Sequence, residues 1–358
     1  MATATPLLAE PGASPPLRLT RGSLPRWAPA GMFAASLGAA LLVMLVTSFN
    51  WYGWGALTFL LYVVVITTVS RRVEGSRRST DRLVTALVFT AFALALLPLL
   101  ALVWTVLRRG VPGLTFEFLT TTMRGVIGAG GGVEHAIVGT LLVTGLAALI
   151  SVPIGLLTAI YLVEYSGGRL GRWVTLMVDV MTGIPSIVAG LFAYALFEIF
   201  FGPGVRMGAA GSVALSVLMI PFVVRSSEEM LRLVPAELRE ASYALGIAKW
   251  RTVVKVVIPT AIAGLTTGVT LAVARVIGET APLLLVAGLT TSMNTDPFHD
   301  RMTTLPVYAF SAFATPGFPP EAGYQRAWSA ALVLIILVML LNLIARLVSR
   351  FFGPRTGR

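Results

Sequence analysis

Two charged residues interrupt an apolar stretch late in the chain. Arg275 and Glu279 lie four positions apart within residues 259–289, a spacing that puts two side chains on one face of a helix. A guanidinium keeps its charge, and its planar fork of donors can hold two oxygens of a phosphate group. The pair therefore predicts an oxyanion site inside a membrane span. The alternative is that the two side chains neutralise each other and only hold helices together.

The backbone around Glu279 is predicted to be irregular. Gly278 and Pro282 flank it, so we expect a loosened helix whose free backbone groups line a cavity.

A second carboxylate, Asp179, is expected to be buried about two helical turns into its span, with Ser186 just beyond it. It could orient Arg275 in a pathway, or pair structurally with Arg172 or Arg225 near the cytoplasmic edge. We favour the structural interpretation, since an acid directly on an anion path would repel the cargo.

Other kinds of chemistry find little support in the residues. The chain has no cysteine, which excludes thiol chemistry and disulfides. The only histidines, His135 and His299, each have one adjacent carboxylate, so we expect them to be solvated and no metal to be bound. The glycine-rich residues 128–132 lack the Lys-Ser/Thr ending of a phosphate-binding loop. We therefore expect no catalytic residue, no metal and no cofactor in this chain.

Composition sets the environment of these residues. Hydrophobic residues make up 56% of 358 positions, charged residues make up 12%, and the mean hydropathy is +0.85; soluble domains average about 25% charged residues. One span needs about 20 mostly apolar residues. We predict an all-α polytopic membrane protein with about eight spans: two within residues 27–70, broken at 50–55, and one each within 83–107, 136–163, 173–200, 207–224, 259–289 and 327–345.

The basic residues give the orientation. Most of the 27 fall in alternate segments between spans, which places those segments and both termini in the cytoplasm. The net charge of +11 then reflects topology and contact with lipid headgroups, not a nucleic-acid partner. The predicted organisation is a disordered cytoplasmic tail (residues 1–30), a two-span extension with a basic cytoplasmic linker (31–82), a six-span core (83–350) and a second cytoplasmic tail (351–358).

The longest charged segment, residues 225–258, is predicted to form two short helices and a turn. Ser226 or Ser227 has the character of a helix cap, and a proline ends that helix. Residues 236–245 read as a second helix, which Gly246 ends in a left-handed turn. Apolar positions then recur at helical spacing, so an amphipathic helix should follow on the membrane surface.

Four residues of this segment carry a specific resemblance. Glu240, Ala241, Gly246 and Pro259 have the spacing of the EAA loop of ABC importer permeases, although Ser242 replaces the second alanine. In that family the short helix sits in a groove of a cytoplasmic ATPase, and the glycine allows the turn that presents it. The alternative is an ordinary amphipathic interfacial helix.

The sequences of three further segments narrow the resemblance to one group of ABC importer permeases. Residues 132–140, 185–192 and 274–284 are similar to the A-type permeases of phosphate-specific transporters, PstA, and the similarity extends over about residues 83–350. It implies the six-helix core of a type I ABC importer, here preceded by two additional N-terminal helices. It also implies that Arg275 and Glu279 serve phosphate passage.

The same resemblance implies partners and a mechanism. We expect a homologous second permease (PstC-like), two copies of a cytoplasmic ATPase (PstB-like) that hold ATP and Mg, and an extracytoplasmic phosphate-binding protein (PstS-like). The assembly would lie in the cell (inner, cytoplasmic) membrane and work by alternating access. The alternatives are import of another oxyanion, such as sulfate or molybdate, and a membrane scaffold or sensor without transport.

Overall fold

The computed structural model describes residues 22–47 and 49–352, and every regular element within them is a helix. The chain divides into two compact units, and the boundary between them follows Leu102. The predicted tails, residues 1–30 and 351–358, lie mostly outside the described residues. The predicted limits of the membrane domains, 31–82 and 83–350, stay predictions.

The first unit is a helical hairpin followed by the start of a long helix. Helices α1 (Ala28–Thr47) and α2 (Trp51–Val73) pack against each other, and α3 (Ser76–Gly110) begins after a short corner. The buried carboxylate of Glu74 holds this corner together. It accepts hydrogen bonds from Arg82 Nε at 2.6 Å and from Ser70 Oγ at 2.8 Å. The hydrogen bond from Arg82 is the main reason why the pKa of Glu74 falls to about 2.

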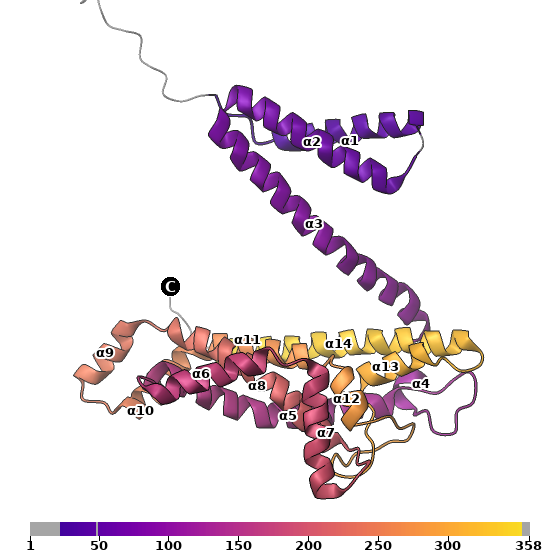
Figure 1. Cartoon of the computed structure of the whole chain (residues 1–358), viewed down its shortest axis with the longest axis vertical. Coiled ribbons are helices and arrows are strands. Elements are labelled where there is room, and N and C mark those ends of the chain that lie inside the picture. Colours follow the sequence, from indigo (N-terminus) through magenta and orange to yellow (C-terminus); the bar gives the residue numbers. More distant parts are fainter. Residues whose placement is uncertain (1–21, 48, 353–358) are drawn as a thin grey trace, which may run out of the picture. The chain divides into compact units, whose positions relative to one another are not determined.

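The second unit contains the remaining helices (Figure 1). After the end of α3 they are, in order, η1 (Val111–Gly113), α4 (Phe116–Thr120), α5 (Glu134–Ile160), η2 (Tyr161–Tyr165), α6 (Arg169–Thr182), α7 (Ser186–Phe201), α8 (Gly208–Arg232), α9 (Ala236–Ala244), α10 (Lys249–Thr252), η3 (Val253–Val257), α11 (Ile258–Val276), α12 (Ala281–Val286), α13 (Leu305–Ala314) and α14 (Pro320–Phe352).

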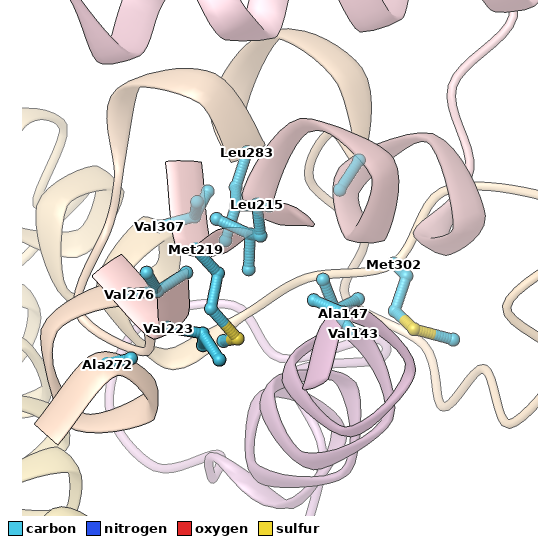
Figure 2. Packing of buried hydrophobic residues seen from close by; sticks show 11 residues of the cluster. Val143, Ala147, Leu215, Met219, Val223, Ala272, Val276, Leu283, Met302 and Val307 are labelled. Carbon is cyan, nitrogen blue, oxygen red and sulfur yellow. The ribbon is translucent and has the colours of Figure 1, made fainter. Parts of the chain in front are cut away.

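Helix α8 is the centre of this second unit. In the most apolar 18-residue stretch of α8, 72% of the residues are buried. The corresponding shares are 28% for the span that contains α5 and 17% for the span that contains α14. Alanine, serine and glycine predominate in its first turns, which lets neighbouring backbones approach closely in a membrane. Figure 2 shows its buried Leu215, Met219 and Val223 gathered with Val143 of α5 and Val276 of α11. This core holds α5, α8 and α11 together.

The membrane-protein fold is confirmed. Within residues 22–47 and 49–352, seven helices are long and apolar enough to cross a membrane, or eight if one bent pair counts as a single span. That pair corrects the predicted span at residues 173–200. Helices α6 and α7 meet at 106°, because Pro185 forces the residue before it out of the helical region.

The predicted span at 259–289 is interrupted at the place where a loosened helix is predicted, since α11 ends at Val276 and α12 begins at Ala281. Two further predictions about helix ends are wrong. Ser226 and Ser227 do not start a helix, because α8 continues through them to Arg232. The separate surface helix is also absent: residues 249–276 run on through α10, η3 and α11 as one span-length helix.

Candidate functional site

Arg275 lies in the last turn of α11 and reaches toward α8. Its guanidinium carbon is 4.2 Å from the centre of the Phe222 ring, a cation–π contact that strengthens away from water. Its helix neighbours Ala272 and Val276 are buried in the core, whereas Arg275 itself is exposed. A cation in a span is costly unless it faces a cavity, a partner or a pathway. Arg275 therefore marks a surface that must be completed by one of these.

Glu279 does not share a helix face with Arg275, contrary to the prediction. It lies in the break between α11 and α12, where its N–H still donates to the carbonyl of Val276 at 3.0 Å. Pro282, in the first turn of α12, starts the new helix without an N–H of its own. Among the described residues no ion pair joins Glu279 to Arg275. The loosened backbone is confirmed, and the mutually neutralising pair is not formed.

Asp179 pairs with Arg225, as the structural interpretation predicted. Arg225 of α8 donates to Asp179 of α6 and, at 2.8 Å, to Glu228 one turn along its own helix. Glu228 also accepts from Arg232 at 2.5 Å. The expectation that Asp179 is buried is wrong, since its side chain is 57% exposed; α6 ends at the sharp bend and buries little against α8. Ser186 begins α7 directly after that bend, and its pathway role stays a prediction.

Helix α9 and the turn after it lie within the predicted segment 225–258, between α8 and α10 in the chain. Helix α9 exposes Glu240 and Ala241, and Gly246 follows it with φ at +73°. The N–H of Gly246 donates to the carbonyl of Tyr243 at 2.9 Å, which closes the turn. Pro259 is exposed in the first turn of α11. The helix and the left-handed turn are therefore present, and their outer face is free to contact another protein.

Two contacts at these sites were not predicted. Phe222 lies beneath Arg275, and the sequence held no signal for it, because an aromatic residue is ordinary in an apolar helix. Glu164, in η2 at the end of α5, pairs with Arg239 of α9 at 2.8 Å. A carboxylate at the end of a predicted span, close in topology to a basic loop, was a usable signal for that pair.

His135 also differs from expectation. It is 2% exposed, and its ring packs edge-on against Tyr308 with the centroids 5.5 Å apart. His299 is exposed, as expected, and contacts Asp296 at 2.6 Å. Within the described residues, no group of three or more His, Cys, Asp or Glu is arranged to hold a metal ion.

The fold and the site together define a class of protein. It is a multi-pass helical membrane protein with an exposed arginine in one span and a short exposed helix and turn between two spans. Residues 151–358 match the model of the binding-protein-dependent transport system inner membrane component family. A crystal structure of a bacterial alginate ABC transporter, in complex with an alginate pentasaccharide-bound periplasmic protein, has the same fold. It aligns with a TM-score of 0.57 at 14% identity, over 78% of this chain and 97% of that one.

Curated relatives give the narrower group. A PstA 1 phosphate transport system permease protein from Mycobacterium tuberculosis is 47% identical, over 79% of this chain and 91% of the relative. A PstA protein from Yersinia pestis is 35% identical, over 78% of this chain and 92% of the relative. The chain belongs to the PstA family of binding-protein-dependent transport permeases.

Proposed function

We propose that this chain is the A-type permease of an ATP-driven phosphate importer and forms half of its translocation pathway. The observation that carries the proposal is Arg275, an exposed guanidinium in a membrane span with no ion-pair partner among the described residues. Relatives named as phosphate transport system permeases support phosphate as the cargo. The other half of the pathway comes from a homologous permease (PstC-like), which covers the exposed side of Arg275.

The distribution of basic residues supports a cytoplasmic position for both termini and for α9. Two copies of a cytoplasmic ATPase (PstB-like) bind ATP and Mg, and the exposed outer face of α9 docks in a groove on one of them. Phosphate arrives on a separate extracytoplasmic binding protein (PstS-like). Movement of α9 when ATP binds reorients the spans, so that the cavity opens alternately to the two sides.

Arg275 offsets the cost of removing phosphate from water inside this cavity. The guanidinium rests on the Phe222 ring in this structure, which leaves its edge and its donors free for oxygen atoms. Glu279, in the adjacent break, limits how tightly the anion is held, since a carboxylate near the site repels it. The site therefore binds phosphate well enough to admit it and weakly enough to release it.

The cargo is tested by uptake of labelled phosphate into proteoliposomes that contain the purified complex and its binding protein. We expect unlabelled phosphate to compete with the labelled anion, and sulfate and molybdate not to compete. Import of labelled sulfate or molybdate, but not of labelled phosphate, by the same complex would assign a different oxyanion. An assembled complex that imports none of the three would support a scaffold or sensor instead.

A further inference from the structure

The guanidinium of Arg239 on α9 connects three separate elements. Its Nε and Nη2 donate to Glu164 Oε1 in η2, at 3.0 and 2.8 Å. Its Nη1 donates to the carbonyl of Val234 at 2.6 Å, and its Nη2 also donates to the carbonyl of Leu231 at 3.0 Å. Leu231 lies in the last turn of α8 and Val234 two residues beyond its end, so Arg239 holds the end of α8 to the end of α5.

This contact is shielded from water. The side chain of Glu164 is 4% exposed and that of Arg239 is 18% exposed. Apolar residues beside it, including Ala159, Leu231 and Val257, form a buried cluster. A charge pair in such surroundings is screened little by salt, and loss of one partner leaves the other charged and buried. The pair is therefore costly to separate.

Apart from Arg239, helix α9 contacts α10 and η3, at the start of the helix that continues as α11. Ser242 is the one buried residue in the helix, and its hydroxyl lies 2.8 Å from that of buried Thr252 in α10. Apolar packing does not hold α9 in place, so polar contacts and the chain itself must transmit its movements. Short linkers join α9 to α8 and α10. Helix α5 has no such linker, since Glu164 and Arg239 are 75 residues apart.

A second contact reaches the same end of α5. Lys249 of α10 lies over the ring of Tyr165, with its Nζ 5.0 Å from the ring centre. Tyr165 and Glu164 are neighbours in η2, a wider helical turn of a kind that is frequent at functional sites. Helices α9 and α10 thus both contact η2, and Arg239 provides the more buried of the two contacts.

We propose that Arg239 is a positioning residue whose contact with Glu164 passes the movement of α9 to α5, and so couples ATP hydrolysis to reorientation of the spans. This inference rests on the proposed transport function. When α9 moves, η2 moves with it and carries α5 along the buried face of α8. Without the contact, α9 still docks on the ATPase but moves α5 less, so ATP is hydrolysed without matching import.

The test compares two rates in the same proteoliposomes: ATP hydrolysis and labelled phosphate import by the complete complex. The variants are Arg239→Gln, Glu164→Gln and the double variant, and copurification of the ATPase measures assembly. The matched control is Arg232→Gln, which removes an arginine 67% exposed that pairs with Glu228 on its own helix. We expect each single variant to raise the ATP hydrolysed per phosphate imported by about five-fold or more, the low end of typical coupling, while Arg232→Gln leaves the ratio unchanged.

The double variant identifies the contact itself. If the two residues act through one contact, the double variant resembles either single variant; independent roles would add. An unchanged ratio in assembled Arg239→Gln, or additive effects, would overturn the proposal. Failure of both single variants to assemble while Arg232→Gln assembles would also overturn it, since the pair would then serve folding alone. A wild-type complex that imports no phosphate would instead refute the proposed function.

Discussion

Replacement of Gly246 by valine should uncouple ATP hydrolysis from import. Gly246 lies two residues beyond Ala244, the last residue of α9, with φ at +73°. Its N–H donates to Tyr243, and the N–H of Ile247 donates to the carbonyl of Ser242 at 3.2 Å. These two bonds form a Schellman motif, which needs a left-handed residue at this position. The turn therefore sets the direction in which the chain continues from α9 to α10.

The cost of the substitution comes from the backbone alone. A Cβ added at Gly246 would meet nothing within 4 Å, so no clash contributes. The left-handed conformation costs an ordinary L-residue about 1–2 kcal/mol, and a β-branched residue finds it less accessible still. At 1.4 kcal/mol per factor of ten, the population with the correct turn falls about 5- to 30-fold or more.

The assay measures ATP hydrolysis and phosphate import together in proteoliposomes. Gly246→Val should raise the ATP used per phosphate, whereas the matched control Gly246→Asn should stay close to wild type, because asparagine tolerates the left-handed region. Normal coupling in an assembled Gly246→Val complex would refute the reasoning. Equal damage by asparagine and valine would mean that a side chain at the contact surface matters, not the backbone.

Two other predictions concern stability. An added Cβ at Gly139 in α5 would lie 2.1 Å from the carbonyl oxygen of Thr303, whereas one at Gly145 in the same helix would meet nothing within 4 Å. Gly139→Ala should therefore lower the free energy of unfolding by about 1–3 kcal/mol and lower the melting temperature in detergent. Gly145→Ala should raise the melting temperature, because alanine has the higher helix propensity. Similar melting temperatures for the two variants would contradict this packing. The pKa of Glu74 is lowered from 4.5 to about 2, mainly by the hydrogen bond from Arg82, so its stabilisation is present above pH 4.5 and lost as the pH falls toward about 2. Glu74→Gln should lack that part of the acid dependence of thermal unfolding, and an unchanged acid profile would argue against the contact.

The sequence predicted helix α9 well. The predicted helix at 236–245 agrees with α9 to within one residue at its end, because Pro235 and Gly246 act through the conformations of their own backbones. The spans were also predictable, since composition determines which segments can enter a bilayer.

Features set by packing were harder to predict. Pro153 and Pro221 lie inside continuous helices, whereas Pro185 follows a sharp bend; the sequence does not distinguish these cases, because neighbouring helices decide whether a broken backbone is satisfied. Ser227 looked like a helix cap, but it is buried within α8, so packing overrode a local preference.

Contacts between distant segments lay further beyond local reasoning. Arg275 and Glu279 were placed on one face by assuming an unbroken helix, and the break after Val276 separates them. The place of Glu164 at the end of a predicted span indicated a basic partner, but the choice of Arg239 depends on how α5 packs on α8, which no pattern within either segment reveals.

The central claim, that phosphate passes Arg275, is tested most directly by the initial rate of labelled phosphate import by an assembled Arg275→Gln complex. The matched control is Arg169→Gln, which removes an exposed arginine at the start of α6. We predict that Arg275→Gln abolishes import while the ATPase still copurifies, and that Arg169→Gln imports at the wild-type rate. Import at the wild-type rate by assembled Arg275→Gln would contradict the account.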